Sequence, residues 1–186
     1  MRVGLVMLVS GCLGGCSVLW DEPEPIGNVA QAVKRVDSVL GDTFEAIHPR
    51  LKWREGPAES SENRNSFTNT ANGEATVGRT RYVRTKVSKA KLTALVKAVY
   101  GHWRAAGYKM SEVHAVGPSF SGTASDGCVL RFSMGGYGNI SVSAGVDAVS
   151  SAVGGPIEGE EGDKFPEAPN GGPDYAPDVR DPYWSK

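Results

Sequence analysis

Apolar residues recur every three or four positions in two stretches of the chain, and this spacing predicts two amphipathic helices. The first helix is expected from its N-cap, Asn28, to residue 47, because Pro49 disfavours helical geometry in the residue before it. The second is expected from its N-cap, Ser88, to residue 106, where a glycine follows. The two apolar stripes are Val29, Val33, Val36, Leu40, Phe44 and Ile47, and Leu92, Leu95, Val96, Val99, Trp103 and Ala106.

Apolar and polar residues alternate in the later part of the chain, which predicts strands at residues 119–125, 128–134 and 140–146. Asp126-Gly127 lies between the first two strands and predicts a two-residue hairpin turn, in which both residues have a positive φ. The inward side chains of this meander are expected to be Phe120, Gly122, Ala124, Cys128, Leu130, Phe132, Met134, Ile140, Val142, Ala144 and Val146. Shorter strands are expected at 51–55, 80–87 and 108–113.

Residues 56–78 are rich in Ser, Asn and Glu and show neither period, so a long loop is expected there. Residues 27–149 are expected to form one domain of ordinary size. The pattern of elements predicts an α+β fold. It is a two-layer sandwich, with two helices packed on one face of a mainly antiparallel sheet.

The chain begins with a short apolar leader that carries one basic residue, Arg2, and closes in small residues. These are the parts of an export signal, and the leader is shorter than the roughly 20 residues that span a bilayer. Its last residues, Leu13-Gly14-Gly15-Cys16, resemble the bacterial lipobox. The resemblance implies that residues 1–15 are a cleaved signal peptide, that Cys16 carries a diacylglyceryl group, and that residues 16–26 form a lipidated tether.

Other interpretations of the leader remain open. Val9-Ser10-Gly11-Cys12 also fits the lipobox pattern but leaves a shorter leader. Residues 3–9 could instead form a buried strand of a cytosolic protein, or the true start could lie upstream. The acidic, Pro-containing segment that follows favours export, because such a segment is typical of a tether and not of a connection after a core strand.

The chain as a whole resembles the small lipoproteins of actinomycete-like bacteria. The resemblance rests on the lipobox, the tether, the use of Ala, Gly and Val, and the segment from Ala46 to Pro57. It implies a protein on the extracytoplasmic face of the cell membrane, held there by its N-terminal diacylglyceryl anchor. It implies no particular activity.

If the lipobox is used, the three cysteines leave no pair for a folding disulfide in the mature chain. Cys12 would leave with the signal peptide and Cys16 would carry lipid, so Cys128 would remain alone. Cys128 belongs to the inward alternation of its strand, and we therefore expect it to be an inert core residue.

Residues 150–186 are rich in Pro, Gly, Asp and Glu, and we expect a disordered tail there. From Glu158 onward this tail carries eight acidic and three basic side chains, a net charge of −5. The rest of the chain therefore carries +4, since the whole chain has −1. The tail could lie over the basic stretch at residues 75–111 as a counter-charge, and Tyr183 and Trp184 could dock on the domain.

The outward positions of the predicted meander are mostly hydroxyl side chains, and they include one arginine. We take Ser121, Thr123, Arg131, Ser141 and Ser143 as a possible binding surface, for example for a cell-wall glycan. A merely solvated sheet face is the simpler interpretation. The basic residues at 75–111 could contact anionic lipid or a cell-wall polyanion, and export argues against nucleic acid as a partner.

No catalytic motif is recognisable. The histidines have no metal-ligand spacing, and the glycine-rich turn at 135–138 lies between strands, where it would not cradle phosphate. We expect no cofactor and no metal. The sequence favours an exported, lipid-anchored, non-enzymatic binding module for an envelope protein or cell-wall polymer. The alternative is an exported hydrolase of cell-wall material that uses the 56–78 segment with Glu112 and His114.

Overall fold

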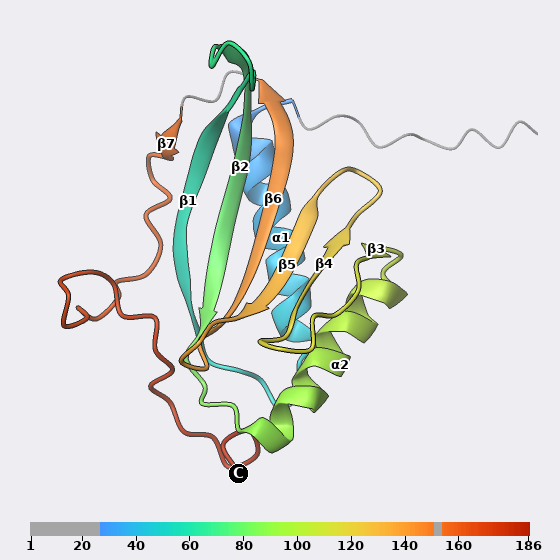
Figure 1. Ribbon diagram of the computed structural model, residues 1–186, viewed down its shortest axis with the longest axis vertical. Helices are drawn as coiled ribbons and strands as arrows, with labels where there is room; N and C mark the ends of the chain where they lie inside the picture. The colour runs from blue at the N-terminus through green and yellow to red at the C-terminus, as the bar shows by residue number, and fades with distance from the viewer. Residues whose placement is uncertain (1–26, 151–153) are drawn as a thin grey trace, which may run out of the picture.

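The computed structural model describes residues 27–150 and 154–186 (Figure 1). The predicted lipidation site, Cys16, and the predicted signal peptide and tether lie outside these residues. The elements in chain order are α1 (Val29–Glu45), β1 (Trp53–Arg64), β2 (Ala71–Val83), α2 (Lys89–Ala105), β3 (Lys109–Met110), β4 (Ser119–Thr123), β5 (Val129–Met134), β6 (Ile140–Ser150) and β7 (Gly155–Pro156). The strands form one sheet in the order β3-β4-β5-β6-β2-β1-β7, and every neighbouring pair is antiparallel.

Both helices pack on the same face of the sheet, which confirms the predicted α+β class. In Figure 1, α1 runs behind β2 and β6, and α2 lies beside the β3–β4 end. The Asn28 side chain accepts a hydrogen bond from the Gln31 amide, and Ser88 does the same for Lys91. Both predicted N-caps are therefore confirmed. In the described part of the chain, neither helix combines the length and apolarity needed to cross a membrane.

The core lies between the helices and the inner face of the sheet. The Trp103 indole of α2 is fully buried and packs edge-on against Phe120, which stacks on Phe132. Its Nε1–H donates a 2.9 Å hydrogen bond to the Thr43 hydroxyl on α1, and that hydroxyl donates to the Val39 carbonyl. This chain of bonds satisfies the buried polar atoms and fixes α2 against α1.

The prediction of a loop at residues 56–78 is wrong, because β1 and β2 form a long hairpin there. A six-residue turn joins the strands, in which Asn65 Oδ1 accepts from the amides of Phe67 and Thr68. The hairpin has no apolar alternation because its far half extends beyond the helices and is solvated on both faces. Its inner positions near the core are small or polar residues such as Ala58 and Ser60.

The meander matches its prediction, although its first turn does not. Gly127 has a φ of 82°, whereas Asp126 keeps a negative φ. The Gly127 amide donates to the Ala124 carbonyl, and the Ala124 amide donates to the Cys128 carbonyl. A longer turn that ends in a left-handed glycine therefore replaces the two-residue turn. Cys128 is fully buried as expected, and burial raises the pKa of its thiol to about 11.

The expected disorder of the tail is also wrong for residues 154–186, which lie along β1 and continue to the N-terminus of α2 (Figure 1). The Ala58 amide donates to the backbone carbonyl of Glu160, and the Ile157 amide donates to the carbonyl of Ala58. The tail therefore pairs with the outer edge of β1. Trp184 is 1% exposed, and its Nε1–H donates to the Pro49 carbonyl at 2.8 Å. Backbone pairing and one buried aromatic thus offset the ordering entropy of a mostly polar segment.

We expect Trp184→Ala to lower the free energy of unfolding by about 3–5 kcal/mol, because it leaves a large cavity and an unpaired Pro49 carbonyl. Urea denaturation followed by circular dichroism measures this change. The matched control is Phe67→Ala in the hairpin turn, where the ring is 96% exposed and the change should stay within about 0.5 kcal/mol. Equal effects of the two variants would contradict the docking of the tail.

Candidate binding face of the sheet

The second face of the sheet carries no helix, and the register gathers polar side chains on it. Arg131 of β5 lies directly opposite Ser121 of β4 and Ser143 of β6. Side chains that are direct cross-strand partners point to the same face, so these three form one row. Thr123 and Ser141 lie on the neighbouring rows of the same face. The five residues proposed from the sequence therefore share one face, whereas their role in binding stays a prediction.

A hollow of about 410 Å³ opens beside this row. Its floor contains Gly78 of β2 and Gly145 of β6, which are direct cross-strand partners. Because neither residue has a side chain, the polar layer on the sheet is interrupted there. A Cβ at Gly145 would meet nothing closer than the Val77 carbonyl oxygen at 3.7 Å. No close contact at that position demands a glycine, and its absent side chain leaves open volume.

The rim of the hollow carries two carboxylates that sequence analysis did not single out. Glu59 of β1 lies opposite Gly78, and Asp147 extends from β6. The Thr76 hydroxyl donates a 2.6 Å hydrogen bond to Asp147 Oδ1, which holds that carboxylate against the sheet. The paired glycines were the available signal, since a glycine inside an alternating strand often marks a close approach by another group.

Arg131 stands out among the arginines of the sheet. Four others lie in strands, and each forms an ion pair: Arg54 with Asp178, Arg64 with Glu62, and Arg79 and Arg81 with Glu55. Arg131 has no carboxylate partner among residues 27–150 and 154–186, and its side chain is exposed. It therefore presents a free guanidinium at the centre of a polar face.

A smaller hollow of about 280 Å³ lies on the other side of Arg131. Its lining includes Glu112 and His114, the pair considered from the sequence, together with Ser119 and Ser121. The 56–78 segment does not reach this hollow; its residues line the larger one instead. The structure thus separates the two groups that the hydrolase interpretation had placed in one deep pocket.

Aromatic rings bound the lower end of the face. Tyr82, opposite Ser141, stacks on Tyr175 of the tail with ring centroids 4.1 Å apart, and Phe165 packs edge-on against both rings. Burial raises the pKa of the Tyr82 hydroxyl to about 12. Tyr137, the aromatic considered for glycan stacking, is 95% exposed in the β5–β6 turn.

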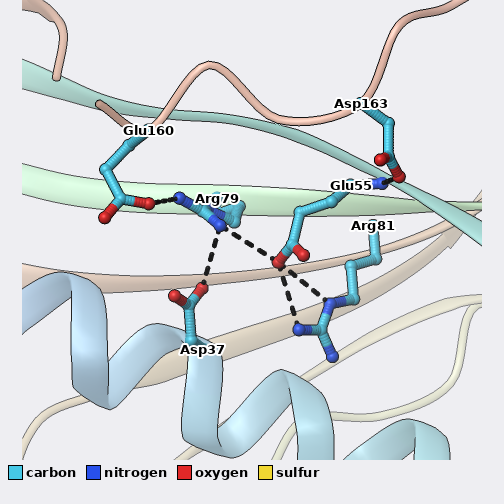
Figure 2. Close-up of polar contacts among 6 residues, drawn as sticks. All are labelled: Asp37, Glu55, Arg79, Arg81, Glu160 and Asp163. Atoms are coloured by element: carbon cyan, nitrogen blue, oxygen red, sulfur yellow. Dashed lines mark hydrogen bonds and ion pairs between the residues drawn. The ribbon is translucent and has the colours of Figure 1, made fainter. Parts of the chain in front are cut away.

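A second polar cluster lies on the helix face, and its charged side chains pair with one another (Figure 2). The Arg79 guanidinium is buried and pairs with Asp37 of α1 at 3.4 Å, with Glu55 of β1 at 3.2 Å, and with Glu160 of the tail. Arg81 also forms an ion pair with Glu55, at 3.1 Å, and its guanidinium carbon lies 4.1 Å from the centroid of the Trp53 ring. This cluster joins the helix, the sheet and the tail, and we assign it a structural role.

The acidic tail neutralises part of the basic stretch. Glu160 pairs with Arg79, and Asp178 pairs with Arg84 at 2.8 Å. The Arg84 guanidinium lowers the pKa of the Asp178 carboxyl to about 2. These contacts agree with the predicted intramolecular counter-charge. Within the described ranges, no group of three His, Cys, Asp or Glu side chains is placed to hold a metal ion.

No protein-family model, no curated protein and no solved structure matches this chain. The assignment of function therefore depends on the residues and geometry described above.

We expect Arg79→Met to destabilise the protein by about 2–3 kcal/mol at pH 7, because it removes the buried guanidinium that pairs with three half-buried carboxylates. Burial already raises the pKa of Asp37, and loss of Arg79, which lowers it, would raise it further. An acid with a raised native pKa costs stability when ionised, so the deficit should shrink as the pH falls from 7 towards 4.

Urea denaturation at pH 7 and pH 4 measures both effects of this substitution. Arg64→Met is the matched control, because the Arg64 side chain is 52% exposed in its pair with Glu62. The control should change stability by less than about 1 kcal/mol at both pH values. A pH-independent deficit in Arg79→Met would contradict the role given to the ion cluster.

Proposed function

We propose that this protein is exported, is anchored to the extracytoplasmic face of the cell membrane by lipid on Cys16, and binds an envelope component without transforming it. The open face of the sheet is the binding surface in this proposal. The ligand is an envelope protein or a cell-wall polymer.

The anchoring part of the proposal is supported by Leu13-Gly14-Gly15-Cys16 and the acidic, Pro-containing segment after it. Two acyl chains hold a protein on a membrane stably, whereas one chain gives only marginal binding, at about 0.8 kcal/mol per buried CH₂. A diacylglyceryl thioether would therefore suffice as an anchor. The segment up to residue 26 would keep the binding face at a distance from the bilayer.

One observation carries the binding part of the proposal. An uncovered sheet face combines a hollow over paired glycines, Gly78 and Gly145, with the unpaired guanidinium of Arg131. An exposed charge without a partner is common on a solvated surface, so the hollow beside Arg131 is the feature that distinguishes this face. The volume of about 410 Å³ lies in the range of small-ligand sites.

The second candidate is a hydrolase that uses the smaller hollow. Glu112, His114 and three serines gather there beside Arg131, which could bind an oxyanion. A catalytic role for His114 predicts that His114→Ala removes turnover of a cell-wall substrate while leaving retention on the polymer unchanged. Retention without turnover in the unmodified protein favours the binding module.

For the anchor, we expect Cys16→Ser to move the protein from the membrane fraction to the soluble or precursor fraction, because serine cannot form the thioether. Cys12→Ser is the matched control and should leave the protein on the membrane. Mass spectrometry of the mature N-terminus should find a diacylglyceryl-modified Cys16. An intact Met1 on soluble protein from the cell interior would overturn this part of the proposal.

For the face, we expect a photo-cross-linking residue at position 143 to capture one envelope component in intact cells. Adding Gly145→Val, which fills the hollow with a strand-compatible side chain, should abolish this capture. The same cross-linker at position 67, in the β1–β2 turn, is the control. Capture that persists with Gly145→Val would contradict the proposed face.

A further inference from the structure

The charges on the open face are arranged to recognise two opposite charges on one ligand. Arg131 supplies the cationic side, and the hydroxyls of Ser121 and Ser143 flank it on the neighbouring strands. A guanidinium binds a carboxylate through paired, charge-assisted hydrogen bonds, and hydroxyls beside it can donate to the same oxygens. This row therefore fits a carboxylate.

The anionic side lies across the same hollow. Glu59 and Asp147 are exposed, and neither has an ion pair among the described residues. Arg79 contributes to the lining, but its guanidinium is engaged on the opposite face by Asp37, Glu55 and Glu160. The two rim carboxylates are therefore available to bind a cationic group, and they would repel a polyanion such as a phosphate-rich polymer.

The spacing favours a ligand longer than a single amino acid, whose amine and carboxylate lie on adjacent carbons. Asp147 is four residues along β6 from Ser143, or about 13 Å of strand. If the Arg131 and Asp147 side chains stand upright on the sheet, their charged groups lie about this far apart, and an extended tripeptide of about 10 Å with a hydrogen bond of about 3 Å at each end spans that distance. A hollow of about 410 Å³ accepts a ligand of this size.

We infer that the open face binds a short zwitterionic peptide, with its carboxylate on Arg131 and its amino group on Glu59 and Asp147. This inference rests on the proposed binding function and names its ligand class. A free peptide and a peptide side branch of a wall polymer present the same chemistry. The two sources are separated by the experiment.

The experiment titrates trialanine into the isotope-labelled protein and follows the amide signals of β5 and β6 by NMR. We expect saturable shifts at Arg131 and Ser143. Trialanine with an amidated C-terminus and N-acetyl-trialanine should each bind at least about tenfold more weakly, because each lacks one charge. Arg131→Gln should weaken the binding of trialanine by a similar factor. This variant should also no longer prefer a free C-terminal carboxylate over the amide.

Arg104→Gln on α2 is the matched control and should leave binding unchanged. A parallel arm measures retention of the protein on purified cell-wall polymer in the presence and absence of trialanine. Competition by trialanine assigns the ligand to wall-borne peptide, and binding of trialanine without retention assigns it to free peptide.

Two outcomes would overturn the inference. One is equal binding of trialanine and its amidated form. The other is retention on the polymer that depends on Arg131 but is insensitive to trialanine, which would leave the proposed binding face intact. A different result would contradict the proposed binding face itself: cross-linking at position 143 that persists when Gly145→Val is added.

Discussion

The packing of both helices on a single face of the sheet is the constraint on which the rest of this structure depends. The strands of the meander must present apolar side chains to that side, and alternation then directs the intervening residues to solvent. In β5, Leu130 and Phe132 enter the core, so Arg131 must point away from it. The proposed binding face is thus a direct consequence of how the core is built.

The edge of the sheet is protected by the same chain. An exposed edge strand offers unpaired backbone groups to other chains, and the segment after β7 pairs with β1 and removes part of that risk. Ion pairs fix this segment at two places, at Glu160 beside Arg79 and at Asp178 beside Arg84. The acidic composition that suggested disorder is therefore matched to basic partners on the domain.

The elements with a strong apolar period could be predicted from the sequence, and those without it could not. The stripe around Leu40 and Val99 is sufficient to define both helices, and the alternation around Leu130 defines the meander. The long hairpin has no such signal, because small or charged residues such as Ala58 and Arg79 occupy its inner positions. Arg79 is buried only because three carboxylates from distant segments surround it, and no local pattern reveals that.

The candidate face likewise combines features that could be predicted from the sequence with features that could not. The outward serines and Arg131 follow from alternation, and their placement on one face could be expected before the structure. The hollow could not, because it depends on the register that sets Gly78 opposite Gly145. Glu59 joins the rim only through the β1–β2 pairing, in a segment whose composition resembles that of a loop.

The central claim is that the open face is occupied in the cell envelope, and site-directed labelling tests it most directly. Cysteines introduced at Ser143 on the face and at Ala94 on the exposed side of α2 would be treated with a membrane-impermeant maleimide. The account predicts that both react in purified protein, and that in intact cells position 94 reacts while position 143 is protected. Equal reaction at the two positions in cells would contradict it.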